Sequence, residues 1–512
     1  MFTPPSDPII VLCTLNAKYI HASLGLRYLL ANMGSLASQT VLREFTVRRK
    51  PQEMVDELLA LSPHIIGFGV YIWNVAQTTA LVRLLKQARP DVKVVLGGPE
   101  VSHEWAQQEI FQLADHLITG WGDISFPKLG QALLYGPQPL MKVIVGEQPT
   151  LDQIALPYAH YSDADLAHRL LYVEASRGCP FKCEFCLSSL DKTAKAFPLD
   201  IFLASLESLY QRGARNFKFV DRTFNLKIDT SVRILQFFLD RMSDHLFVHF
   251  EVIPDHLPQR LRALIAQFPA GALQLEVGVQ TFSSEVQQRI ARRQDNEKTV
   301  ANLTWLLAHS QAHLHVDLIF GLPGESLESI AAGFDRLVAI GPHEIQLGLL
   351  KRLRGTPIAR HTEAHGMVYE TQSPYTVLQT AALQAGTVQR LTCAARYWDL
   401  VANSGRFKAT LPILLQGESA FASFLACSDW LWNTTATTHG LTPENLVDAL
   451  FDYLTTQRGL PLEEVRSVLL SDYSSSGARA CPACLRAVLH RPQAPVSHAN
   501  ARLLLQRQGR HT

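Results

Sequence analysis

Residues 174–186 read EASRGCPFKCEFC and place three cysteines, Cys179, Cys183 and Cys186, in the spacing C-x3-C-x2-C. The apolar run at residues 170–173 predicts a strand that leads into this loop. Three thiolates in one short loop can ligate three irons of a cubic 4Fe-4S cluster and leave the fourth iron open. A structural zinc site is the alternative, but such sites normally have four ligands, and no fourth Cys or His follows at a suitable spacing. The spacing therefore favours an iron-sulfur cluster.

Upstream of the cysteines, residues 9–135 alternate between short apolar runs and longer amphipathic segments. The runs predict strands at residues 9–13, 39–45, 64–70, 92–96 and 116–119. The segments between them predict helices at residues 23–33, 51–61, 75–89 and 105–113. This alternation is typical of a doubly wound parallel sheet, so we expect a Rossmann-like α/β domain over residues 1–140.

Glycines gather where these predicted strands end. In a doubly wound sheet, ligands lie beyond the carboxyl ends of the strands. Glycines there let a bulky ligand approach the backbone, but glycine also marks ordinary strand-to-helix turns, so both interpretations stay open. The glycines in question are Gly67, Gly69, Gly97, Gly98, Gly120 and Gly122.

Strand-helix alternation returns after a connector at residues 136–165, which contains Pro137, Pro139, Pro149 and Pro157. Prolines discourage long helices, so the connector predicts a linker over residues 141–165. Six strands are expected downstream, and six repeats predict a partial (β/α)6 barrel over residues 166–365, with its chemistry at the carboxyl ends of the strands. The strands are expected to begin at Leu170, Asn216, Phe247, Leu273, Leu314 and Glu344.

Beyond residue 366 the pattern becomes mostly helical and predicts a third domain over residues 366–512. Helices are expected at residues 375–391, 411–432, 443–456 and 462–472. The polar and aromatic segment at residues 397–407 has two open roles, facing a substrate across the barrel mouth or packing in the core. Cys481 and Cys484 supply only two thiols, which favours free or redox-labile cysteines over a second metal site.

Composition narrows the class of protein. Lys and Arg number 47 against 46 Asp and Glu, so no global charge favours nucleic acid as a partner. The first eight residues lack the pattern of a secretory leader, and no apolar run nears the length of a membrane span. Eight cysteines, three of them clustered, fit a reducing compartment better than a disulfide framework. We therefore expect a cytoplasmic protein without a membrane span.

The cysteine loop, with the aromatic Phe185 before its last cysteine, resembles the cluster loop of radical S-adenosylmethionine (SAM) enzymes. Later segments resemble that family's SAM motifs in order, namely FVDRTF at residues 219–224, EVGVQT at residues 276–281 and DLIFGLPGE at residues 317–325. The resemblance implies that the three cysteines form the catalytic cluster site and that SAM fills the open iron. It implies SAM contacts from Phe185, Asp221, Glu251, Glu276, Gln280, Asp317 and Gly321. Taken singly, each polar side chain could instead be satisfied by neighbouring backbone.

The first domain, directly upstream of such a loop, resembles the cobalamin-binding domain of cobalamin-dependent radical SAM enzymes. The elements Gly-Gly-Pro-Glu and Gly-x-Gly-Asp match the loops that hold cobalamin there. The chain departs from the base-off motif D-x-H-x-x-G, because His21 stands four residues before Gly25. For His21, capping or packing and cobalt ligation both stay open. The resemblance implies cobalamin contacts from Asn16, Gly69, Val70, Tyr71, Gly97, Gly98, Pro99, Glu100, Gly120 and Gly122.

The three expected domains resemble a subgroup of this family whose carboxy-terminal domain has no known function. The resemblance implies methyl transfer to an unactivated carbon through a 5'-deoxyadenosyl radical and methylcobalamin. Cobalamin-assisted rearrangement or cyclisation without methyl transfer is the alternative, and a non-catalytic cobalamin sensor is disfavoured by the intact cysteine loop. An external electron donor of the flavodoxin or ferredoxin type is implied, and the substrate is expected to be a small molecule or a peptide.

Overall fold

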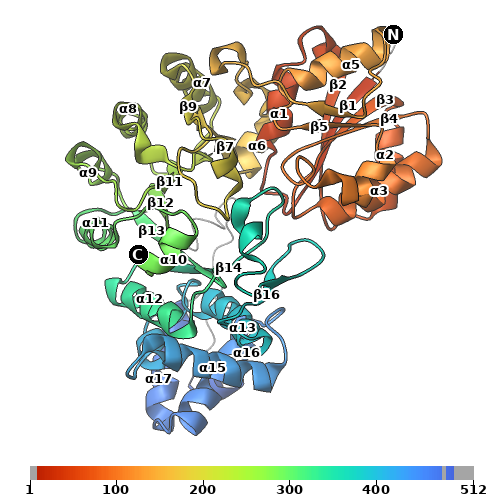
Figure 1. Ribbon diagram of the computed structural model, residues 1–512. Coiled ribbons are helices and arrows are strands. Elements are labelled where there is room, and N and C mark those ends of the chain that lie inside the picture. The colour runs from red at the N-terminus through yellow and green to blue at the C-terminus, as the bar shows by residue number, and fades with distance from the viewer. Residues whose placement is uncertain (1–8, 476–479, 489–512) are drawn as a thin grey trace.

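The computed structural model describes residues 9–475 and 480–488, which form three successive parts along the chain (Figure 1). Residues 1–8, on which the expected absence of a leader rests, lie outside the described residues. Among the helices in the described ranges, none combines the length and apolar character needed to cross a bilayer.

The first part is a parallel sheet with the strand order β2-β1-β3-β4-β5-β6, which confirms the predicted doubly wound fold. The central strand β1 is buried along almost its whole length, because a parallel strand covered on both faces takes a continuous apolar run. The strands are β1 (Ile9–Asn16), β2 (Thr40–Thr46), β3 (Pro63–Gly69), β4 (Lys93–Gly97), β5 (His116–Thr119) and β6 (Val143–Val145).

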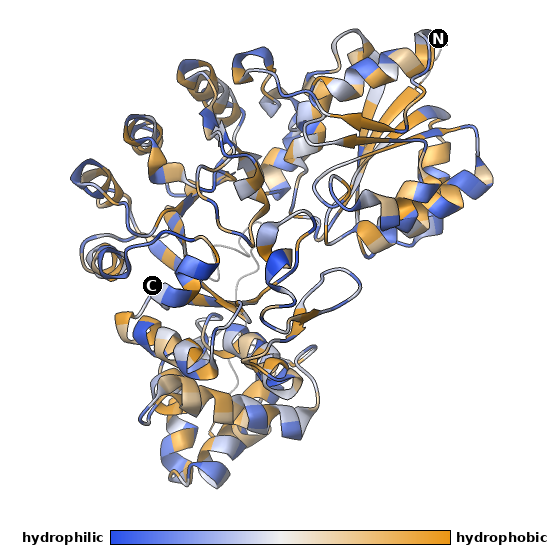
Figure 2. Ribbon diagram, in the orientation of Figure 1, coloured by the Kyte–Doolittle hydropathy of each residue, from blue (hydrophilic) through white to orange (hydrophobic). Residues whose placement is uncertain are grey.

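Helices cover both faces of this sheet. One apolar core lies under α2 (Pro51–Leu59), α3 (Val75–Ala88) and α4 (Glu109–Leu113), and the other lies under α1 (Leu24–Ala31) and α5 (Ser125–Tyr135). Figure 2 shows the strands as a hydrophobic layer between helices whose outer faces are hydrophilic.

The connector contains more structure than its prolines predict. β6 lies inside the predicted linker and pairs in parallel with β5, so the first sheet continues past residue 140. A three-residue edge strand is too short to produce a recognisable apolar pattern. Helix α6 (Asp163–His168) follows, and a capping box formed by Ser162 and Asp165 starts it.

The second part is an open barrel of six parallel strands in the order β14-β13-β12-β11-β10-β7, as predicted. Its outward-facing side chains build an aromatic core in which Phe250 stacks on Phe224 with ring centroids 3.8 Å apart. The strands are β7 (Leu171–Val173), β10 (Asn216–Phe219), β11 (Phe247–Val252), β12 (Leu273–Gln280), β13 (His313–Phe320) and β14 (Glu344–Leu349). The surrounding helices are α7 (Leu199–Gln211), α8 (Ile228–Leu239), α9 (Gln259–Ile265), α10 (Ser284–Arg289), α11 (Asn296–His309) and α12 (Leu327–Ile340).

The third part is mostly helical, as predicted, but two of its expected helices are wrong. Residues 375–391 do not form one helix, because β16 (Val377–Gln379) pairs with β15 (Val368–Tyr369) and the helix begins only at Ala385. Residues 411–432 break near Gly417, after which Ser419 caps a new helix. The helices are α13 (Ala385–Val401), α14 (Thr410–Leu414), α15 (Ala420–Thr435), α16 (Pro443–Asp452) and α17 (Leu462–Ser475).

The segment at residues 397–407 takes the packing role. Tyr397 and Trp398 are buried in α13, and the Asn403 amide donates to the Ile345 carbonyl at 2.9 Å and accepts from the Ile345 N–H at 3.0 Å. Asn403 thereby ties the third part to β14. Cys481 is exposed and Cys484 is partly buried, and their redox lability stays a prediction.

Candidate active site

The cysteine loop, defined as residues 174–186, leaves the carboxyl end of β7 and is fixed by backbone contacts. The Cys179 N–H donates to the Asp191 carbonyl at 2.8 Å, and the Glu184 N–H donates to the Ile290 carbonyl at 3.0 Å. Gly178 has φ +86°, and a Cβ there would lie 3.0 Å from the backbone of Ala194. Glycine therefore lets the loop turn closely against residues 191–194.

All three cysteines line one cavity of about 210 Å³, which we call the barrel cavity. Cys179 and Cys183 are buried, and Cys186 is partly exposed. Five of the seven side chains predicted to contact SAM line the same cavity, brought there from the loop and from three neighbouring strands. They are Phe185, Glu251, Glu276, Gln280 and Asp317.

The other two predicted residues, Asp221 and Gly321, do not line the barrel cavity. Asp221 is buried under the loop, where its carboxylate accepts the Ala175 N–H at 2.9 Å and the Ser176 hydroxyl at 2.5 Å. Burial raises the pKa of Asp221 to about 7. Gly321 has φ +82° and packs against the Val377 side chain. Asp221 therefore holds the start of the cysteine loop, whereas Gly321 contacts neither the loop nor the cavity lining in these interactions.

The barrel cavity holds one carboxylate whose ionised form is stabilised. Burial alone would raise the pKa of Glu276, but the nearby His249 imidazole and the charge of Lys218 lower it below its usual range. His249 Nε2 lies 3.0 Å and Lys218 Nζ 3.2 Å from Glu276 Oε2. Glu276 is thus an anion facing the cavity.

Two nearby carboxyl groups behave differently. Burial, together with the charges of Glu276 and Glu251, raises the pKa of Asp317 well above its usual value. Burial also raises the pKa of Glu251, although Arg222 at 2.8 Å opposes this shift. Unequal pKa values among neighbouring carboxyl groups are characteristic of functional sites.

Sequence reasoning missed the cations of this cavity, Arg222, Arg292 and Arg293. Arg292 Nη1 lies 3.6 Å from Cys183 Sγ. These arginines lie in loops, Arg222 after β10 and the other two between α10 and α11, so no strand pattern indicated them. Alternation along the barrel strands indicates only their inward polar residues, for example Lys218 between buried Phe217 and Phe219. Such alternation marks a polar lumen, whereas complete barrels are usually filled by branched apolar side chains.

A second cavity, of about 280 Å³, lies at the carboxyl ends of β3, β4 and β5, and we call it the sheet cavity. Glycines without side chains form part of its lining. Aromatic side chains from α1 and from the loop after β5, including Tyr28 and Trp121, form another part. The predicted cobalamin contacts that line it are Gly69, Tyr71, Gly97, Gly98, Gly120 and Gly122.

Four predicted contacts lie away from the lining. Asn16 donates to the Glu44 carboxylate at 2.9 Å and to the His21 carbonyl at 2.8 Å. Val70 is buried, and its carbonyl accepts the N–H of Glu100 at 3.4 Å. Pro99 and Glu100 follow the lining glycine Gly98 in the chain, and the Glu100 carboxylate accepts from Arg354 Nε at 2.9 Å.

His21 lies outside the lining of the sheet cavity. Its Nδ1 is 2.8 Å from the Tyr172 hydroxyl on β7, and its backbone forms a parallel bridge to Leu170. These contacts support the packing role, with His21 at the joint between the first sheet and the barrel.

Arg177 connects the two cavities. Its guanidinium lines the sheet cavity, forms a forked ion pair with Asp123 at 2.9 and 3.2 Å, and lies over the Tyr28 and Trp121 rings. Two residues further on, Cys179 lines the barrel cavity. A ligand in each cavity would therefore approach the same short segment of chain.

Three family models match successive stretches of the chain. The model of the B12 binding domain matches residues 10–130, and that of the Radical SAM superfamily matches residues 173–337. The third model, that of a protein of unknown function (DUF4080), matches residues 363–508. The chain therefore contains a radical SAM domain, which a B12 binding domain precedes and a DUF4080 region follows.

Curated relatives share parts of this arrangement. The cobalamin-dependent radical SAM methyltransferase TokK of Streptomyces tokunonensis is 22% identical over 58% of this chain and 48% of its own length. The uncharacterized methyltransferase PH0819 of Pyrococcus horikoshii is 29% identical over 35% of this chain and 44% of its own. The chain therefore spans about half the length of the curated relatives it matches.

Solved structures share the fold. The cobalamin-dependent S-adenosylmethionine radical enzyme OxsB, with aqua-cobalamin and S-adenosylmethionine bound, has a TM-score of 0.63 at 13% identity and covers 99% of this chain and 84% of its own. The methyltransferase TsrM from Kitasatospora setae, with cobalamin and a 4Fe-4S cluster bound, has a TM-score of 0.55 at 18% identity and covers 73% and 79%. At such identities the likeness concerns the fold.

Proposed function

We propose that this protein is a cobalamin-dependent radical SAM methyltransferase that acts on an unactivated carbon. The observation that carries the proposal is the shared segment at Arg177–Cys179, which borders the sheet cavity at one residue and the barrel cavity two residues later. When bound, a 4Fe-4S cluster and SAM supply a carbon radical that can remove hydrogen from such a carbon, and cobalamin supplies a carrier for the methyl group.

The residues of the barrel cavity fit a cluster with SAM. In the described part of the chain, no three potential ligands gather closely enough for a single metal ion. A cubic cluster instead needs thiolates placed around a space, each on a different iron. Cys179, Cys183 and Cys186 border such a space, and we assign them as its ligands.

Charged groups in the barrel cavity complement the amino acid end of SAM. The ionised Glu276 suits a positively charged amino group, and Arg292 and Arg293 suit a carboxylate. Glu251 is held by Arg222, so it keeps a fixed orientation toward a ligand. Orientation of this kind is the main contribution that a preorganised site makes to a positioned reaction.

The residues of the sheet cavity fit a large planar cofactor. Gly67, Gly69, Gly97 and Gly98 border it without side chains, and a Cβ at Gly67 would already reach 2.6 Å from the Phe126 ring. Among the described residues that line it there is no His, Cys or Met. We therefore propose that cobalamin would be held here by glycine backbone and aromatic side chains, without an imidazole, thiolate or thioether ligand to cobalt from these lining residues.

Further parts of the proposal lie beyond the described cavities. The substrate is a small molecule or a peptide, an external electron donor of the flavodoxin or ferredoxin type reduces the cluster, and the protein works in the cytoplasm. Transfer RNA methylthiolation is disfavoured, because the first domain contains only Cys13 and so cannot supply a second three-cysteine cluster.

Anaerobic reconstitution with iron, sulfide and hydroxocobalamin tests the proposal. After desalting, we expect retained iron and cobalamin, and with SAM and a strong reductant we expect both 5'-deoxyadenosine and S-adenosylhomocysteine. Cys183→Ala should lose 5'-deoxyadenosine, whereas Cys427→Ala, at a buried cysteine in α15, should keep both products. Deoxyadenosine without S-adenosylhomocysteine would favour rearrangement, and absence of retained cobalamin would refute the assignment of the sheet cavity.

A further inference from the structure

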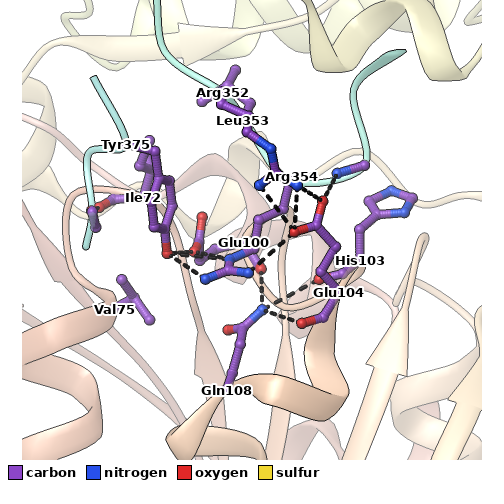
Figure 3. Close-up of polar contacts among 12 residues, drawn as sticks. Ile72, Val75, Glu100, His103, Glu104, Gln108, Arg352, Leu353, Arg354 and Tyr375 are labelled. Atoms are coloured by element: carbon purple, nitrogen blue, oxygen red, sulfur yellow. Dashed lines mark hydrogen bonds and ion pairs between the residues drawn. The ribbon is translucent and has the colours of Figure 1, made fainter. Parts of the chain in front are cut away.

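A polar network with a buried centre, the Glu100–Arg354 pair, joins the first sheet to the segment after the last strand of the barrel (Figure 3). Glu100 and Glu104 follow the lining glycines Gly97 and Gly98 at the end of β4. The Glu100 carboxylate accepts from Arg354 Nε at 2.9 Å and from the Tyr375 hydroxyl at 2.6 Å. Glu104 accepts from Arg352 at 3.1 Å and from the Gly355 N–H at 3.3 Å. Both arginines follow β14 directly.

The network is built more tightly than a surface ion pair. The Glu100 side chain is 3% exposed and that of Arg354 is 16% exposed, so the pair lies largely outside water. Gln108 donates to the Glu100 carbonyl at 3.0 Å and holds the loop that carries both glutamates. A buried network in which each member has partners fixes one arrangement, whereas exposed pairs contribute little.

Close packing accompanies the charges. Gly355 has φ +78°, and the His103 ring occupies the space that a Cβ there would need. The Ser373 hydroxyl also donates to the Ile72 carbonyl, beside the cavity-lining Tyr71. The segment after β14 therefore contacts the first part through charge and through shape.

The same segment continues to the cysteine loop. The helical turn Pro357–His361 follows, and His361 Nε2 lies 2.7 Å from Glu184 Oε2. The Ile358 N–H donates to the Glu184 carbonyl at 2.9 Å. Glu184 stands between Cys183 and Cys186. We call residues 352–361 the strap, because one end holds the β4 loop and the other holds the cysteine loop.

The strap closes the open side of the barrel. β7 and β14 are the two edge strands of its sheet, and the first part is attached to both edges. At the β7 edge, Glu44 accepts from Arg169 at 2.8 Å and Tyr172 contacts His21. At the β14 edge the strap makes the attachment together with Ser373 and Tyr375, which follow it in the chain. Loss of the Arg354 contact would thus weaken the attachment at the β14 edge and leave that at the β7 edge intact.

We propose that Arg354 is a positioning residue, which sets the sheet cavity at a fixed distance from the barrel cavity by holding the β4 loop. This inference rests on the proposed function, because a methyl group that passes between two cavities requires a fixed separation. Misplacement by about 1 Å can cost on the order of 100-fold in rate. Cleavage of SAM to 5'-deoxyadenosine needs only the barrel cavity, so the two products report on different requirements.

The test compares Arg354→Gln with Arg354→Lys in the full chain. Arg390→Gln is the matched control, since Arg390 forms a forked pair with Asp429 at 2.7 Å in the third part. After loading with iron, sulfide and hydroxocobalamin, we expect Arg354→Gln to retain cobalamin and keep 5'-deoxyadenosine within about twofold. Its S-adenosylhomocysteine should fall by about tenfold or more, with Arg354→Lys between it and wild type. Arg390→Gln should match wild type.

Hydrogen exchange of the unloaded protein gives a readout independent of activity. In Arg354→Gln, amides of residues 98–108 should exchange at least about fivefold faster, while those of β1 should not change. Gly355→Ala, which forces the strap away from His103 without removing charge, should give the same pattern. An unchanged product ratio together with unchanged exchange would overturn the inference, as would equal loss of both products. If wild type makes no S-adenosylhomocysteine, the proposed function fails, and the exchange result alone decides the role of the strap.

Discussion

Replacement of Gly98 by alanine should displace the β4 loop and weaken cobalamin binding. Gly98 lines the sheet cavity with φ +105°, and a Cβ there would lie 2.5 Å from the Val70 carbonyl oxygen. Ordinary carbon-to-oxygen contacts begin at about 3.3 Å, so the loop must move by roughly 0.8 Å. The Val70 N–H donates to the Gly97 carbonyl at 2.8 Å and its carbonyl accepts from Glu100, so movement breaks backbone hydrogen bonds.

The alanine side chain at residue 98 has two energetic costs, and the same substitution at a second glycine measures one of them alone. A non-glycine residue at such a φ costs about 1–3 kcal/mol, and overpacking costs a further 1–3 kcal/mol. Gly213 has φ +100° with nothing within 4 Å of its Cβ position, so Gly213→Ala carries the first cost alone. Because cobalamin would need the β4 loop in its wild-type position, binding to Gly98→Ala must overcome the overpacking cost, and about 2 kcal/mol corresponds to roughly 30-fold in the dissociation constant of hydroxocobalamin.

Titration of the unloaded protein with hydroxocobalamin, followed by quenching of tryptophan fluorescence, to which Trp121 of the sheet cavity contributes, measures this difference. Gly213→Ala should bind like wild type, and Gly98→Ala should bind at least about 30-fold more weakly. Equal affinities for the two alanine variants would refute the reasoning, because the steric cost would then be absent or relieved without moving the loop.

Three further predictions concern stability. Burial raises the pKa of Glu325 to about 7. Between about pH 4.5 and 7 the folded state therefore binds more protons than the unfolded state. The free energy of unfolding should thus fall by up to about 3 kcal/mol as pH rises through that window. Glu325→Gln should flatten this dependence in thermal unfolding at pH 5.5 and 8, and parallel curves would contradict it. Phe250→Ala should cost about 3–5 kcal/mol in denaturant unfolding of the barrel, because the ring is fully buried against Phe224, and a loss below 1 kcal/mol would count against this packing. Asn403→Ala should cost about 2 kcal/mol and accelerate hydrogen exchange at Ile345, and unchanged exchange there would mean that another group holds this edge of β14.

Much of the fold could be predicted from the sequence because its signals are local. The period of apolar residues predicted five of the six strands of the first sheet and all six strands of the barrel, and the cysteine spacing located the loop around which the barrel cavity forms. Prediction from the local pattern was wrong where the same pattern is compatible with either a helix or an extended segment. Residues 375–391 look helical, but pairing of β16 with β15 and contacts of Tyr375 with Glu100 hold their first part extended.

The sequence alone determined which residue types this protein offers, namely three cysteines in one loop, glycines at strand ends and carboxylates on barrel strands. Only the tertiary structure decided which of them share a cavity. Asn16 and Glu100 stand next to predicted ligand loops, yet each turns to a partner from a distant segment, Asn16 to Glu44 and Glu100 to Arg354. The physical reason is that periodicity and turn chemistry depend on residues close together in the sequence. The partner of a buried polar group is instead whichever group the tertiary packing brings within hydrogen-bonding distance.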